Sequence, residues 1–208
     1  MRLLVILAAL LAVTAARATD LVVSVRTAAG APVANAVVTV YAGAHTPPLS
    51  AARFDWPMRM VQQHLMFSPF VLIAPVGATV AFPNLDKVRH HVYSFSPPHP
   101  FELKLYGQDE TRTVRFDKPG VVALGCNIHD QMIAFIKVVD TPLAARTGDD
   151  GEATLHDLPA EAVTLHVWHP YMRAPGNEQA RVINLTGAAA RQVLTVDVRS
   201  PPAMVMKY

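Results

Sequence analysis

Residues 126–132 read Cys-Asn-Ile-His-Asp-Gln-Met, and no other stretch of the chain says as much about its fold and chemistry. Cys126 is the only cysteine among 208 residues. His129 follows it by three positions and Met132 by six. A cysteine at a strand end and a histidine in the tight loop after it can turn onto one ion, with the methionine reaching its axial side. Thiolate, imidazole and thioether donors suit copper.

A copper site of this kind needs a second imidazole from elsewhere in the chain. The adjacent residues His90 and His91 follow a loop-like stretch and begin an expected strand. Successive side chains of a strand point to opposite faces, so only one of the pair can face Cys126. His91 shares its face with Tyr93 and Phe95, which slightly favours His91. The residue pattern alone leaves the choice open.

Two other uses of the cysteine remain possible. A zinc site would need four strong ligands, and Asp130 or His91 could complete one. A nucleophilic Cys126 with His129 as its base lacks a recognisable third orienting group. Because a leftover thiol is a liability in a secreted protein, metal ligation explains its presence best.

The rest of the chain indicates strands and turns. Short β-branched runs are separated by Gly, Pro and Asp residues, which predicts a sandwich or barrel and hence an all-β fold. Residues 42–57 are expected to form a connection, and residues 58–65 either one short helix or an irregular loop. Residues 140–150 form a polar break, after which strands resume.

The first residues have the features of a signal peptide. A positive start at Arg2, an apolar run and the small-x-small site Ala16-Arg17-Ala18 predict cleavage near Ala18. No later segment is apolar for long enough to suggest a membrane helix. We therefore expect an exported, periplasmic protein without a transmembrane segment. Removal of residues 1–18 leaves 16 basic and 16 acidic residues, and their scatter argues against nucleic-acid binding.

Residues 70–140 resemble the cupredoxin family, to which amicyanin and plastocyanin belong. The resemblance is carried by four segments: 77–84 (Gly-Ala-Thr-Val-Ala-Phe-Pro-Asn), 86–92 (Asp-Lys-Val-Arg-His-His-Val), 116–120 (Phe-Asp-Lys-Pro-Gly) and 126–132. It implies a Greek-key β-sandwich. The Cys-x-x-His-x-x-Met spacing is similar to the short ligand loop of amicyanin.

The resemblance also implies the ligand set and the function. One copper ion, cycling between Cu²⁺ and Cu⁺, would be held by His90, Cys126, His129 and Met132. Most cupredoxins carry Asn after the first ligand, where this chain has His91, which changes what braces the ligand loop. The expected protein is not an enzyme but an electron carrier between redox partners, such as a dehydrogenase or a cytochrome. The alternatives are a copper-delivery protein and a metal-free interaction module.

The flanking segments resemble a different fold. Residues 30–38 and 149–159 are similar to parts of a carboxypeptidase-regulatory, transthyretin-like sandwich. We therefore expect a signal peptide (1–18), a discontinuous sandwich (19–57 plus 141–200), an inserted cupredoxin domain (58–140) and a C-terminal tail (201–208). The whole mature chain is similar to periplasmic proteins labelled methylamine utilisation protein. Transient docking is expected through apolar residues beside the loop, such as Ile128 and Met132.

Overall fold

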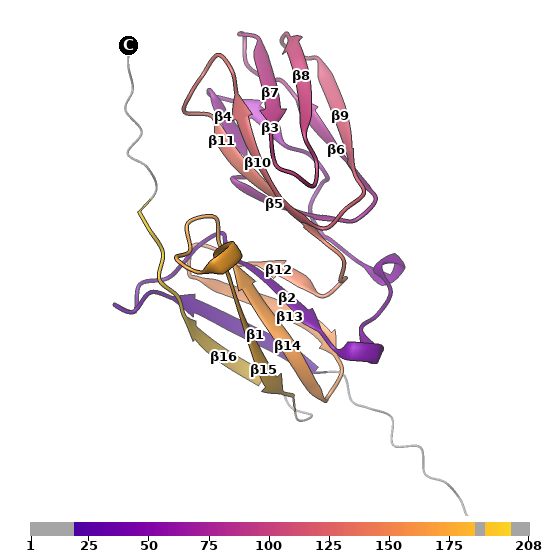
Figure 1. Cartoon of the computed structure of the whole chain (residues 1–208), viewed down its shortest axis with the longest axis vertical. Helices are drawn as coiled ribbons and strands as arrows, with labels where there is room; N and C mark the ends of the chain where they lie inside the picture. Colours follow the sequence, from indigo (N-terminus) through magenta and orange to yellow (C-terminus); the bar gives the residue numbers. More distant parts are fainter. Residues whose placement is uncertain (1–18, 186–189, 201–208) are drawn as a thin grey trace, which may run out of the picture.

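A computed structural model describes residues 19–185 and 190–200 as two β-sandwiches stacked end to end (Figure 1). The expected all-β fold is confirmed, since helical turns within the described residues are limited to three short 3-10 segments, Gly43–His45, Leu49–Ala51 and Pro175–Asn177. No helix in these ranges is long and apolar enough to cross a membrane. The expected signal peptide (1–18) and tail (201–208) lie outside the described residues.

The lower sandwich in Figure 1 packs two sheets, ordered β13-β1-β16 and β12-β2-β14-β15. Its strands are β1 (Thr19–Arg26), β2 (Val37–Tyr41), β12 (Ala144–Arg146), β13 (Glu152–Leu158), β14 (Ala162–Trp168), β15 (Glu178–Asn184) and β16 (Ala190–Thr195). β-branched and leucine side chains on alternate positions fill the space between the sheets, as Leu21, Val23 and Val25 of β1 do. Strands from both ends of the chain therefore build one core.

The upper sandwich contains the strands between these two groups. They are β3 (Val61–Gln63), β4 (Met66–Ser68), β5 (Val71–Pro75), β6 (Ala78–Pro83), β7 (His90–Ser94), β8 (Phe101–Tyr106), β9 (Thr111–Phe116), β10 (Gly120–Cys126) and β11 (Ile133–Val139). One sheet has the order β5-β11-β10-β7-β8. The pairs β3-β4 and β6-β9 form the opposite side, joined by a parallel bridge between Gln62 and Asn84. The strands of the lower sandwich lie within the expected discontinuous domain, and those of the upper sandwich lie within the expected domain 58–140. The division of the chain into these two domains stays a prediction.

Over residues 58–65 the helix alternative was wrong, and the loop alternative holds only for residues 58–60, which precede strand β3. This segment enters the β3-β4 hairpin, whose turn residues His64 and Leu65 both have positive φ. The pattern misled because β3 is short and buries a polar side chain, Gln62. The Gln62 amide donates to the Met60 carbonyl and accepts from the Tyr106 hydroxyl, so its burial leaves no unpaired polar atom.

The two sandwiches meet at a small apolar cluster. Val37 and Trp168 come from the lower sandwich, and Val71, Ile73 and Val139 from the upper one, each no more than 2% exposed. Polar bonds flank this cluster: Arg146 donates to the Val71 carbonyl at 2.8 Å, and Lys137 pairs with Glu178 at 2.7 Å. This contact sets how the upper sandwich is oriented relative to the lower one. The copper-ligand candidates lie in the upper sandwich.

Replacing Trp168 by alanine should reveal how much the junction stabilises the chain. A buried Trp→Ala change leaves a cavity and costs about 3 kcal/mol or more. Val182→Ala is the control, because Val182 is 68% exposed and its loss should cost less than about 0.5 kcal/mol. Urea unfolding of the metal-free protein measures both. Equal midpoints for the two variants would contradict the junction's role.

Acid should weaken the lower sandwich through His169. This side chain is buried, which lowers its pKa from 6.5 to about 4, and its Nδ1 accepts from the Tyr171 N–H at 3.2 Å. Between pH 6.5 and pH 4, His169 binds a proton in the unfolded chain but stays neutral in the folded one. The free energy of unfolding therefore falls as the pH falls towards 4. We expect a loss of about 2 kcal/mol between pH 7 and pH 5.

The measurement is the urea unfolding free energy at both pH values. His169→Gln should remove this part of the pH dependence. His156→Gln, which changes a side chain that is 67% exposed, should keep it. The same pH dependence in both variants would show that another group is responsible.

Candidate metal centre

Three donor side chains converge at one end of the upper sandwich. Cys126 ends β10, His90 begins β7, and His129 lies in the loop between β10 and β11. The Cys126 Sγ atom lies 3.7 Å from His90 Nδ1 and 3.8 Å from His129 Nδ1, and the two imidazole centroids are 5.1 Å apart. All three donor atoms lie within 4.8 Å of one another.

Strand pairing explains why residues so distant in sequence meet. β10 pairs antiparallel with β7, with Cys126 opposite Val92 and Gly125 opposite Tyr93. The Asn127 N–H extends the pairing by donating to the His91 carbonyl at 3.1 Å. The loop then closes with the Met132 N–H donating to the His129 carbonyl at 2.9 Å. This short turn holds the His129 ring beside the sulfur.

The donor set fits a single copper ion. A neutral thiol has one proton and can donate to only one of the two Nδ1 atoms that approach it. The two Nδ1 atoms, 3.7 and 3.8 Å from Cys126 Sγ, lie close enough to the sulfur for one ion to be held by all three donors. One thiolate and two imidazoles in a trigonal arrangement, with a weak thioether, are the donor set of blue-copper sites.

His90, and not His91, faces the sulfur. His90 is 0% exposed, whereas His91 turns to the other face of β7 and pairs through Nε2 with Glu102 at 2.8 Å. The alternation that favoured His91 was misleading because the face it shares with Phe95 is the outer one, and Phe95 is 83% exposed. On this strand, sharing a face with Phe95 indicates the solvent side and not the core.

Met132 is buried in the same core cluster as Cys126, at 1% exposed. It lies three residues beyond His129 and directly precedes β11. Its burial excludes it from the docking surface expected around the loop, because a partner cannot touch it. Ile128 is 47% exposed and remains available. Burial and electrostatic repulsion by His90 lower the pKa of the partly buried His129, which keeps its imidazole neutral and able to bind a metal.

Two residues near the donors were not predicted as part of the site. Asp86 Oδ2 lies 2.9 Å from His90 Nε2, and its carboxylate also accepts the His64 and Leu65 backbone N–H groups. Burial raises the pKa of Asp86, but the bonds from Leu65, His90 and His64 outweigh it and leave the pKa below its usual value. In the sequence, the only sign that Asp86 belongs to the site was its position four residues before His90.

The second unpredicted residue is Tyr106, which is 1% exposed and lies opposite His90 in the β7-β8 pairing. Burial, and next to it the repulsion that an ionised Cys126 would exert, raise the pKa of its hydroxyl, which donates to Gln62. Nothing in the sequence distinguished this tyrosine from others on strands. It closes the core beside the donors and keeps a neutral hydroxyl there.

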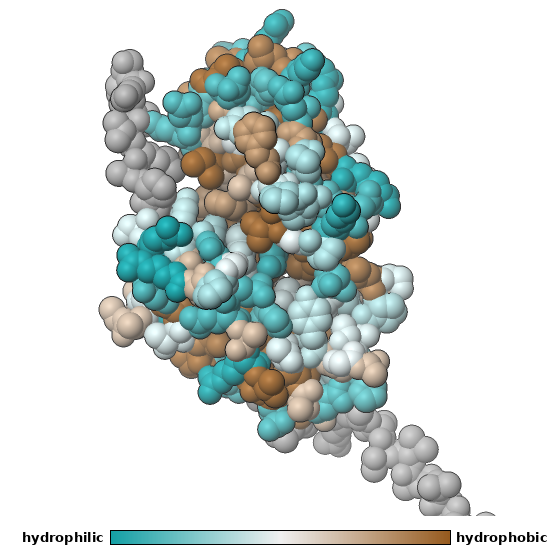
Figure 2. Space-filling view, viewed as in Figure 1, coloured by the Kyte–Doolittle hydropathy of each residue, from teal (hydrophilic) through white to brown (hydrophobic). Residues whose placement is uncertain are grey.

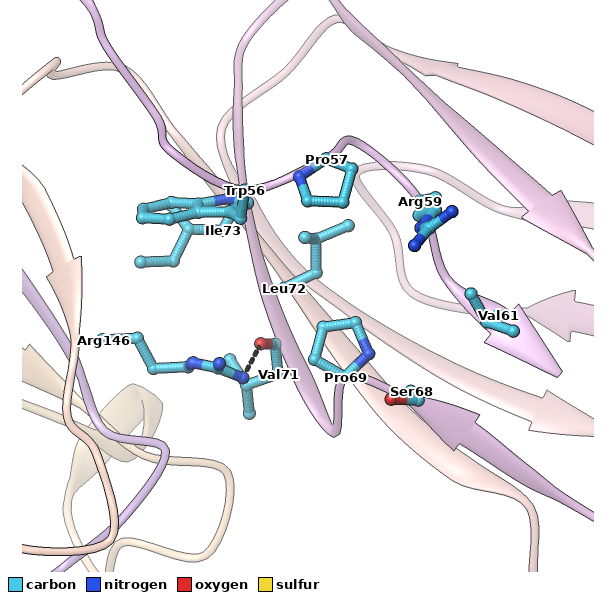
Figure 3. A pocket seen from close by; sticks show the side chains of 10 residues that line it. All are labelled: Trp56, Pro57, Arg59, Val61, Ser68, Pro69, Val71, Leu72, Ile73 and Arg146. Atoms are coloured by element: carbon cyan, nitrogen blue, oxygen red, sulfur yellow. Dashed lines mark hydrogen bonds between the residues drawn. The ribbon is translucent and has the colours of Figure 1, made fainter. Parts of the chain in front are cut away.

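A separate cavity of about 270 Å³ lies at the junction of the two sandwiches (Figure 3). Trp56, Leu72 and Ile73 line its apolar side, and Arg59 and Arg146 bring positive charge. None of its lining side chains is a cysteine, histidine or carboxylate. Its chemistry is therefore unrelated to that of the metal-ligand candidates.

Comparison with known proteins finds similarity only to solved structures; no protein-family model and no curated protein matches the chain. A copper-containing nitrite reductase from Thermus scotoductus SA-01 is 31% identical over 42% of this chain, with a TM-score of 0.38. The match spans only 23% of that enzyme. A purple cupredoxin from Nitrosopumilus maritimus is 22% identical, covering 39% of this chain and 98% of its own, with a TM-score of 0.36. A reduced amicyanin variant is 17% identical, covering 49% and 98% respectively, with a TM-score of 0.37.

Substitution of the adjacent histidines should separate a ligand from a bystander. His90→Ala removes a donor and opens the buried cluster, so copper affinity should fall by more than about 100-fold, beyond the loss typical of an outer-shell partner. His91→Ala removes only a partly exposed side chain and should leave the affinity within about threefold of wild type. Competition with a copper chelator measures both. Equal losses would contradict the assignment of His90.

Proposed function

We propose that this protein is a type 1 (blue) copper protein whose upper sandwich is a cupredoxin domain and which carries single electrons between redox partners. The observation that carries the proposal is the convergence of two imidazole nitrogens on one buried sulfur, 3.7 and 3.8 Å away. When bound, copper supplies a one-electron couple between Cu²⁺ and Cu⁺ at these donors.

The chain contributes a rigid and dry environment for that couple. Cys126 is 3% exposed, and the Tyr93 ring lies against Gly125, where a Cβ atom would come within 2.8 Å of the ring. The burial of Cys126 keeps water from the sulfur, while the Tyr93 ring packs against the opposite face of β10 at Gly125. Because Cys126 and His90 are held by strand pairing rather than by the ion, the donors stay in place in both oxidation states.

Electrons would enter and leave beside His129, which is the partly exposed imidazole of the pair. Several exposed apolar residues lie in the β3-β4 hairpin, in the loop before His90 or in the ligand loop: Leu65, Met66, Leu85, Val88 and Ile128. Hydrophobic surface is visible among polar residues on the upper sandwich (Figure 2). A small surface of this type suits a transient redox partner, such as a dehydrogenase or a cytochrome.

The cellular setting is also part of the proposal. The signal-peptide pattern at residues 1–18 supports a periplasmic protein, and the resemblance of the mature chain supports a role in methylamine utilisation. The alternative with the same donors is a copper-delivery protein, and soft sulfur ligands would also suit Cu⁺ storage. An interaction module without metal is the third reading.

Optical and EPR spectra of the copper-loaded protein test the proposal. Wild type should show an intense visible absorption from thiolate-to-copper charge transfer, because Cys126 is the only thiolate available. Cys126→Ser should lose this band completely, and His91→Ala should keep it. A colourless protein that binds only Cu⁺ would favour delivery. Failure to bind copper at all would leave the metal-free module.

A further inference from the structure

The carboxylate of Asp86, which is partly buried, lies beside the far side of the His90 ring from Cys126. The His90 Nε2 atom lies 2.9 Å from Asp86 Oδ2, and the two side chains are 0% and 13% exposed. A carboxylate can only accept, so Nε2 carries the hydrogen and donates it to Asp86. In the neutral imidazole that a metal requires, the other ring nitrogen, Nδ1, then keeps its lone pair, and it lies 3.7 Å from Cys126 Sγ.

Asp86 is itself held from three sides. The His64 N–H donates to its Oδ1 at 2.7 Å, and the Leu65 N–H donates to its Oδ2 at 3.0 Å. Its own backbone N–H donates to the side chain of Asn84, a fully buried residue, at 2.9 Å. The positive φ values of His64 and Leu65 aim both turn amides at one carboxylate. Rotation of the Asp86 side chain away from His90 would break the two bonds from the His64 and Leu65 N–H groups.

We infer that Asp86 is a positioning residue that orients His90 and whose negative charge favours the oxidised copper site. The inference rests on the proposed function, since it assigns a tuning role at the same site. A carboxylate on the second ring nitrogen fixes the orientation of a metal-ligating histidine and makes it a stronger donor. In a poorly solvated interior, a nearby negative charge stabilises Cu²⁺ more than Cu⁺.

The next residue along the chain supplies a matched control. His91 also donates its Nε2 side to a carboxylate, Glu102, at 2.8 Å. That pair lies on the opposite face of β7, and Glu102 is 56% exposed. Asp86→Asn and Glu102→Gln therefore each neutralise one carboxylate bound to one imidazole. Only the first imidazole faces the sulfur.

The experiment compares the two variants in the full chain after copper loading. Asp86→Asn should lower Cu²⁺ affinity 10- to 100-fold and Cu⁺ affinity less. Each tenfold fall in Cu²⁺ affinity relative to Cu⁺ affinity raises the reduction potential by about 59 mV. Glu102→Gln should change neither quantity. If Asp86→Asn lowers only the melting temperature, Asp86 serves the hairpin alone and the inference is overturned.

A second measurement needs no metal. In the metal-free wild type, NMR should show a His90 Nε2–H signal that exchanges slowly with water, and Asp86→Ala should lose it. Absence of the signal in wild type would overturn the orienting role even if copper binds normally. Conversely, a wild type without a thiolate-to-copper band would refute the proposed function, while the NMR signal would still decide whether Asp86 orients His90.

Discussion

One sulfur atom enclosed between two imidazole nitrogens is the arrangement on which the rest of the upper sandwich depends. His90 and Cys126 are 36 positions apart, and the antiparallel pairing of β7 with β10 brings them together. The side chains of Cys126 and His90 are also buried in the upper sandwich, at 3% and 0% exposed. A register slip of one residue in either strand would turn its donor to the solvent face. The packing that folds this sandwich is therefore also the packing that builds its site.

The sequence predicted the fold class because its signals were local. β-branched runs of strand length, with Gly and Pro between them, led directly to the all-β fold that the structure has. The β3-β4 hairpin escaped prediction because three-residue strands leave no period to read, and because Gln62 is buried through hydrogen bonds rather than through hydrophobicity. How the two sandwiches meet depends on a cluster drawn from four strands, which no single segment reveals.

For the site, the spacing of Cys126, His129 and Met132 could be read directly because the three residues share one loop. The first histidine could not be chosen from alternation alone, since the face that His91 shares with Phe95, just beyond β7, is the outer one. The carboxylate behind His90 was out of reach for a different reason. Its position depends on a turn more than twenty residues earlier in the chain, whose two amides hold it. Tertiary hydrogen bonds of this type leave almost no trace in a sequence.

Strand β11 has a consequence for the architecture as a whole. It begins directly after Met132, and Phe135 and Val139 along it pack in the cluster between the sandwiches. Seven extended residues cover about 20 Å. β11 therefore holds the ligand loop at a distance from the lower sandwich. Anything bound to the far end of the lower sandwich would lie farther still from the ligand residues. Under the proposed function, electrons would enter and leave at the end of the molecule opposite the lower sandwich.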